Sequence, residues 1–164
     1  MRIDQKASLL FASIAGALLL SGLIYYLAFR TALPAPLARL HLRPLALAGS
    51  IERSAFLGWF PSLIHVTAFG LLTCALFRPS VLAALVAGAA WAGIDVLWEL
   101  SCADNHAWLR RGAELIGVGS VPACTYDGAD IVASVAGVAA TTGIAWLVLR
   151  LLSITSSTAQ ERQA

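Results

Sequence analysis

The fold is decided by the stretch from residue 80 to residue 100, which reads SVLAALVAGAAWAGIDVLWEL. As a helix this stretch would be about 30 Å long, which matches the hydrocarbon thickness of a bilayer. The whole chain has a composition to match: 59% of its residues are hydrophobic, 12% are charged and the mean hydropathy is +0.81. A soluble domain of this size carries far more charge. The sequence therefore predicts an all-α membrane protein.

Three further apolar stretches flank this one, two on its N-terminal side and one on its C-terminal side. Only Arg78 and Pro79 separate it from the preceding stretch, so these two helices are expected to form an antiparallel hairpin. Four such helices leave no room for a separate soluble domain, and we expect residues 1–164 to form one compact transmembrane bundle. In chain order the predicted spans are about 7–29, 55–77, 80–100 and 129–152.

The segments between the spans have different compositions. Residues 31–54 combine prolines with arginines among leucines, which favours a loop or a short helix lying in the membrane interface. Residues 101–128 are more polar and are expected to form a loop between the third and fourth helices.

Small residues spaced four apart predict where the helices approach one another, because close packing replaces the hydrophobic drive that lipid removes. Trp91 and Trp98, seven residues apart on the third span, are expected to pack or to face lipid. The candidate small-residue pairs are Ala12 with Gly16, Ala89 with Gly93, and Ala133 with Gly137.

The orientation in the membrane is not decided by charge, because Lys and Arg are almost balanced between the two sides. Cys102 and Cys124 both fall in the loop between the third and fourth spans and could form a disulfide there. Such a bond needs an oxidising compartment, which favours both termini in the cytoplasm. Two free thiols in a reducing compartment are compatible with the same sequence.

Ionisable side chains gather at one membrane face, where the second span begins, the third ends and the fourth begins. His65 follows Pro61 by four residues. Asp95 and Glu99 are spaced four apart and share one helical face. Asp127 and Asp130 open the fourth span. Ionisable groups inside membrane spans usually face a bundle interior or a water-filled cavity. We therefore expect these five side chains to share one polar pocket.

Three interpretations of this pocket stay open. In the structural one, His65 hydrogen-bonds a carboxylate, Asp127 or Asp130 caps the last helix, and Glu99 reaches the headgroup layer. In the second, the His and the carboxylates hold a divalent metal or exchange protons with a polar headgroup. The third is a proton or ion relay, which is weakened because no ionisable residue continues the path across the membrane.

Part of the chain resembles the VanZ-like family of small bacterial membrane proteins. The resembling stretches are LIHV at 63–66, DVLWELS at 95–101 and DGADIVASVAGVAA at 127–140, within a region of about 55–145. The family typically has a His opening one helix, a Glu closing the next, and an Asp-led helix rich in small residues. The resemblance implies a protein of the bacterial inner membrane and cell envelope, in a family with a link to resistance against glycopeptide antibiotics such as teicoplanin.

We therefore expect a small cell-envelope membrane protein whose polar pocket binds a lipid headgroup, an ion or a partner. One alternative is a membrane-embedded enzyme acting on a lipid-linked substrate, with Glu99 or Asp95 as general base and His65 and Asp130 as orienting or metal-binding groups. Another is an accessory subunit of a larger membrane complex. The sequence identifies no cofactor. A net charge of +2 with scattered Lys and Arg excludes a nucleic-acid-binding surface.

Overall fold

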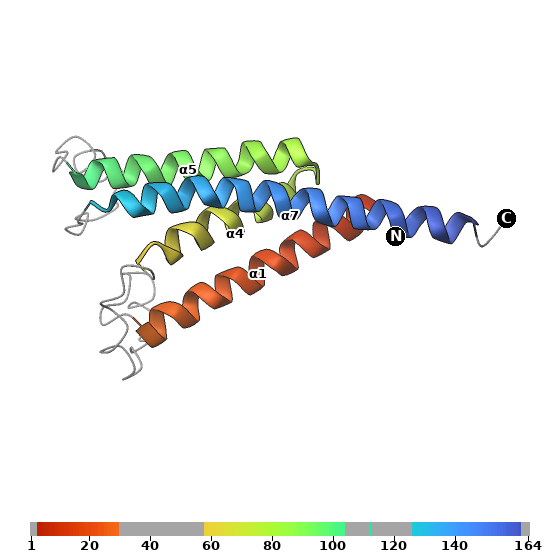
Figure 1. Cartoon of the computed structure of the whole chain (residues 1–164), viewed down its shortest axis with the longest axis horizontal. Coiled ribbons are helices and arrows are strands. Elements are labelled where there is room, and N and C mark those ends of the chain that lie inside the picture. The colour runs from red at the N-terminus through yellow and green to blue at the C-terminus, as the bar shows by residue number, and fades with distance from the viewer. Residues whose placement is uncertain (1–2, 30–57, 104–111, 113–125, 162–164) are drawn as a thin grey trace.

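The computed structural model describes residues 3–29, 58–103, 112 and 126–161, which form a bundle of helices with no strand (Figure 1). Three helices are long and apolar enough to cross a membrane, and α4 is a shorter apolar helix of 17 residues. This confirms the predicted all-α membrane fold, while the predicted interfacial segment at 31–54 and most of the loop at 101–128 lie outside the described residues. The helices are α1 (Ile3–Phe29), α4 (Phe60–Leu76), α5 (Val81–Ala103) and α7 (Gly128–Glu161).

Local sequence signals set the ends of α4 and α5. Pro61 lies in the first turn of α4, where a missing N–H costs nothing, so it opens the helix and does not kink it. Ser80 caps α5, because its hydroxyl oxygen accepts a hydrogen bond of 3.0 Å from the backbone N–H of Ala83. The thiol of Cys74 points at the carbonyls of Arg78 and Ser80, 3.6 Å from each, and closes the turn between the two helices. The predicted hairpin is therefore present.

The short helix α4 is the centre of the bundle. It packs against α1, α5 and α7, whereas α1 and α7 contact each other over a smaller part of their length. More than half of its residues are buried, including the polar side chains of Ser62 and Thr67. The Thr67 hydroxyl donates to the carbonyl of Leu63 on its own helix at 2.7 Å, which satisfies it without a partner from lipid.

Glycines bring α4, α5 and α7 into contact. A Cβ atom on Gly137 would lie 2.7 Å from Cβ of Val66, so α7 can approach α4 there only because residue 137 has no side chain. Gly70 faces Thr141 and the backbone of Gly88 with similarly little space. These contacts join three helices near the middle of the bundle, as expected where van der Waals packing drives association in lipid.

Only one of the three predicted small-residue pairs lies at such a contact. Ala133 and Gly137 are buried, but the pairs on α1 and α5 are exposed, and a methyl group added to Gly16 or Gly93 would meet no atom within 4 Å. The prediction was wrong for those two pairs because Ala-rich helices repeat the spacing on several faces, and the spacing alone does not select the packed face.

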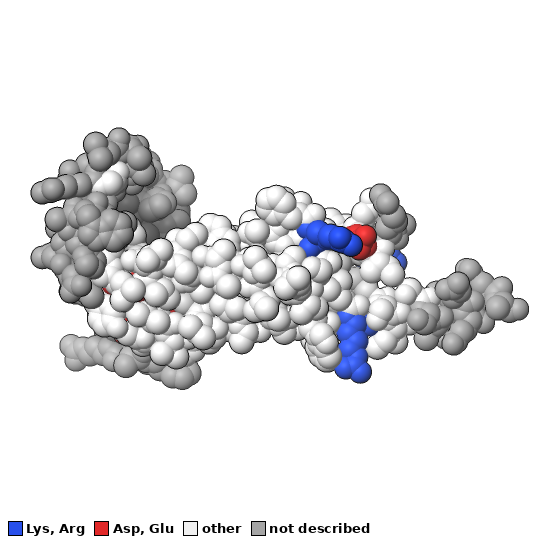
Figure 2. Space-filling model, turned by 90° about the horizontal axis from the view of Figure 1, so that it is seen from above, with Lys and Arg blue, Asp and Glu red and all other residues white. Residues whose placement is uncertain are grey.

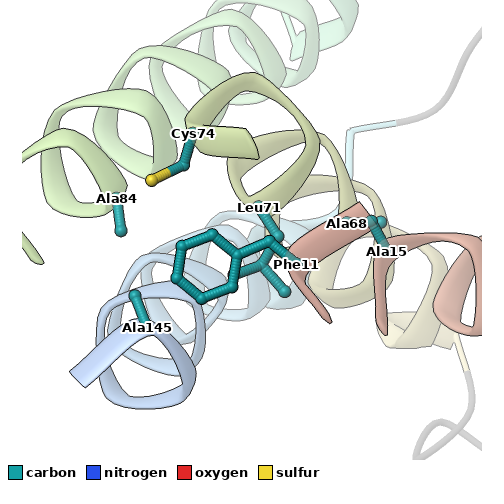
Figure 3. Packing of buried hydrophobic residues seen from close by; sticks show 7 residues of the cluster. All are labelled: Phe11, Ala15, Ala68, Leu71, Cys74, Ala84 and Ala145. Atoms are coloured by element: carbon teal, nitrogen blue, oxygen red, sulfur yellow. The ribbon is translucent and has the colours of Figure 1, made fainter. Parts of the chain in front are cut away.

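A hydrophobic cluster joins all four helices in the half of the bundle nearer the start of α1 (Figure 3). Phe11 is its largest member and is fully buried beside Leu71. Apart from Leu71 the other members are small, which lets the four helices surround a single aromatic ring. The cluster consists of Phe11, Ala15, Ala68, Leu71, Cys74, Ala84 and Ala145.

Charged side chains separate between the two ends of the bundle. Every Lys and Arg in the described residues lies toward the end where α1 begins: Lys6 on α1, Arg78 in the turn after α4, and Arg150 in the C-terminal half of α7. Figure 2 shows these basic groups together with an acidic one at that end of the surface. The opposite end is where α4 and α7 begin and α5 ends.

Candidate functional site

The structure places all five ionisable residues of the predicted pocket at this opposite end of the bundle. His65 lies in the second turn of α4, about 7.5 Å along the axis from its start. Asp95 and Glu99 lie in the last three turns of α5. Asp127 directly precedes α7 and Asp130 lies in its first turn. We call this the carboxylate end, because four of the five side chains are acidic.

Asp127 caps α7 and is itself held by α5. Its Oδ1 accepts a hydrogen bond of 2.9 Å from the N–H of Ala129, and its carbonyl accepts one of 3.1 Å from the N–H of Asp130. Its own N–H donates to Oε2 of Glu99 at 3.1 Å. Glu99 therefore ties the end of α5 to the start of α7, and the capping part of the structural interpretation is present in the molecule.

A second tie between α5 and α7 is formed by Ser134, a residue that the sequence did not single out. Its buried hydroxyl hydrogen-bonds Oδ2 of Asp95 and also lies 2.8 Å from the carbonyl of Asp130. Ser134 follows Asp130 by four residues and so lies on the same helical face. That spacing is a signal by which it could have been found.

The carboxylates of this end are close enough to act on one another. Glu99 interacts electrostatically with Asp95, Asp127 and Asp130. Since each described Lys and Arg lies toward the other end, the described part of the carboxylate end carries a net negative charge when these acids are ionised.

His65 is surrounded by aromatic rings. In the described part of the chain its contacts are with other rings. The hydrogen bond to a carboxylate that the structural interpretation expected is not present among the described residues. Tyr26 of α1 stacks on it with ring centroids 6.4 Å apart, and Phe69 lies 6.0 Å away. Phe69 in turn stacks on Trp91 of α5 at 4.8 Å. The indole N–H of Trp91 donates to Oγ1 of Thr73 at 3.0 Å, which fixes the ring.

A cavity of about 120 Å³ lies between α4 and α5, with the imidazole of His65 and the carboxylate of Asp95 in its wall. The chain was expected to have one polar pocket, but the structure divides it. His65 and Asp95 line the cavity, whereas Glu99, Asp127 and Ser134 form the network between α5 and α7, and Asp95 belongs to both. The described residues that line the cavity are His65, Val66, Phe69, Trp91, Ile94 and Asp95.

Phe69 and Trp91 are the cavity residues whose role was not predicted from the sequence. Phe69 follows His65 by four residues on α4, and Trp91 precedes Asp95 by four on α5. Each helix thus contributes an aromatic ring and an ionisable group on one face, which the i, i+4 spacing would have revealed. Trp98, seven residues after Trp91 on the same helix, is 43% exposed and is not among the described residues that line the cavity.

The donors present do not form a metal centre in the described residues, where no three His, Cys, Asp or Glu side chains converge as ligands. Cys102, near the end of α5, is disulfide-bonded, while Cys74 is free and buried. The predicted partner of Cys102, Cys124, lies outside the described residues.

Comparison of the chain with protein-family models, with curated proteins and with solved structures found no match.

Proposed function

We propose that the protein is a small cell-envelope membrane protein that binds a lipid headgroup at its carboxylate end. The observation that supports this is the cavity between α4 and α5, which combines an aromatic wall with the carboxylate of Asp95. Ligand sites commonly have this character, with mostly apolar walls and a few placed polar groups.

The position of the cavity favours a lipid over a soluble ligand. Asp95 lies eight residues before the end of α5, about 12 Å along the axis, and His65 lies about 7.5 Å from the start of α4. Both depths are near the boundary between headgroups and hydrocarbon. Ile94, which also lines the cavity, is 57% exposed, so the cavity reaches the outer surface of the bundle, where lipid would contact it.

We further propose that both termini are cytoplasmic and that the carboxylate end faces the oxidising side of a bacterial inner membrane. The disulfide at Cys102 supports this, because such bonds persist in oxidising compartments. The resemblance to the VanZ-like family adds the proposal of a role in the envelope that bears on glycopeptide resistance.

The hydrogen bonds of the carboxylates give one oxygen of each a role in the fold. Oε2 of Glu99 holds the N–H of Asp127, and Oδ2 of Asp95 accepts from Ser134. These contacts indicate that Glu99 anchors α7 and that Ser134 fixes the position of the Asp95 carboxylate.

Native mass spectrometry of the protein, purified in a mild detergent, tests this proposal. We expect the wild type to retain a bound lipid and Asp95→Asn to lose most of it. Asn keeps an oxygen that can accept from Ser134, so the variant should fold. The matched control is Asp4→Asn, which removes one charge at the opposite end of the bundle and should retain lipid. Equal retention by Asp95→Asn, or no retained lipid in the wild type, would overturn the proposal.

A further inference from the structure

We infer that the cavity between α4 and α5 is a binding site for an alkylammonium group, the cationic part of an ethanolamine or choline headgroup. This inference rests on the proposed function and specifies the ligand of the same site. It follows from the chemistry of the cavity wall, its charge and its size.

The aromatic rings of the wall suit an organic cation. Phe69 and Trp91 stack on each other at 4.8 Å and both border the cavity. The electron-rich faces of such rings attract alkylammonium groups, with tryptophan the strongest of them. The hydrogen bond from Trp91 to Thr73 keeps the indole in place, so little ordering is needed when a ligand binds.

The carboxylate of Asp95 supplies the counter-charge. Ser134 on α7 holds its Oδ2, so the carboxylate is fixed in the wall before any ligand arrives. Glu99 lies within electrostatic range of Asp95 and adds negative potential. Because a carboxylate attracts a cation and not a phosphate, the cationic end of a zwitterionic headgroup is the part that the Asp95 side of this cavity selects.

The lining of the cavity disfavours bare metal ions, and its size admits a small organic cation. A volume of about 120 Å³ has room for the few heavy atoms of an ethylammonium or trimethylammonium group. A hard metal ion needs six or more oxygen ligands, but among the described residues of the wall the ionisable groups are one carboxylate and one imidazole. Val66 and Ile94 complete a wall that suits alkyl carbons.

The inference can be tested with protein labelled with 5-fluorotryptophan, purified in a non-ionic detergent at pH 8, where an ordinary imidazole is neutral. The ¹⁹F signal of Trp91, identified by its absence in Trp91→Phe, should move saturably as ethylammonium or tetramethylammonium chloride is added. Sodium chloride at equal ionic strength should not move it. Asp95→Asn should weaken the apparent affinity by about tenfold or more, because a charged partner is lost.

Two control variants separate the site from general effects. Trp98→Leu removes an exposed tryptophan from the same helix, and Asp4→Asn removes a carboxylate from the other end. Both should bind ethylammonium as the wild type does. If the Trp91 signal does not respond to either amine, or responds equally in Asp95→Asn, the inference is overturned.

Nanodiscs distinguish a lipid headgroup from a free amine. The signal of Trp91 in discs of equal parts phosphatidylethanolamine and phosphatidylglycerol should be shifted relative to discs of pure phosphatidylglycerol, and added ethylammonium should then have less effect. A response to the soluble amines without this lipid effect would support the alkylammonium site with a free amine as its source. Retention of a lipid in native mass spectrometry with no alkylammonium response would overturn this inference alone, whereas absence of both would also overturn the proposed function.

Discussion

The close approach of α7 to α4 predicts that Gly137→Ala destabilises the bundle. The added Cβ would lie 2.7 Å from Cβ and 2.9 Å from Cγ1 of Val66, and 3.2 Å from the carbonyl oxygen of Leu63. None of these atoms is the end of a flexible side chain, so the helices must separate. Overpacking of this kind costs about 1–3 kcal/mol, which corresponds to a factor of about 5 to 150 in the unfolding equilibrium.

The matched control for this prediction is Gly143→Ala on the same helix. A methyl group there has nothing within 4 Å, so the variant should gain only the better helix propensity of alanine, up to about 1 kcal/mol. Both substitutions share that gain, and the difference between them isolates the contact with Val66. The assay is unfolding of the purified variants in mixed dodecylmaltoside and SDS micelles, followed by circular dichroism. Equal stability of the two variants would refute the packing argument.

Three further predictions concern the site, the cysteines and the topology. Ser134→Ala should lower the free energy of unfolding by about 1–2 kcal/mol, since Asp95 loses a hydrogen-bond donor, whereas Ser21→Ala, whose exposed hydroxyl bonds its own helix, should change it little in the same assay. Peptide mass spectrometry after alkylation of unreduced membranes should find Cys102 unmodified and Cys74 modified only once the protein is unfolded. Alkaline phosphatase fused to either terminus should be inactive and green fluorescent protein fused there fluorescent; active phosphatase at the C-terminus would contradict the proposed orientation.

The positions of the helices could be predicted because hydrocarbon length and apolar composition set them. The hydropathy of the sequence located all four helices, but some helix ends differ from the prediction. The fourth span was expected to end near residue 152, but α7 continues to Glu161 through a stretch rich in Ser and Thr. The second was expected from residue 55, while α4 begins at Phe60, directly before Pro61.

The packed faces of the helices could not be predicted in the same way. In water an apolar stripe marks the buried side of a helix, but in lipid both sides are apolar and the stripe disappears. Ala12 and Gly16 therefore looked as suitable for packing as Ala133 and Gly137, although the former are exposed and the latter buried. What separates them is the shape of the facing helix, such as Val66 opposite Gly137, and that is a property of the fold.

The order of the helices was enough to bring the ionisable residues of the site to one end. Consecutive spans are antiparallel, so the start of the second, the end of the third and the start of the fourth lie at the same membrane face. The order of the helices did not predict which side chains contact one another there. Glu99 was singled out as a possible general base, but its hydrogen bond to the N–H of Asp127 was not foreseen. In the structural interpretation His65 was expected to hydrogen-bond a carboxylate; it shares a cavity with Asp95, but its ring stacks with Tyr26. Those pairings depend on helix rotation, which the apolar sequence leaves undetermined.

The length of α7 has a practical consequence. Its 34 residues extend about 51 Å, compared with a hydrocarbon layer of about 30 Å, and its C-terminal part projects past the other helices (Figure 1). A helical fusion partner can therefore be joined in phase to this projecting part without touching the bundle. The rigid addition would give a 17.2 kDa protein enough mass and asymmetry for particle alignment in cryo-electron microscopy, and the carboxylate end would stay unobstructed for ligands.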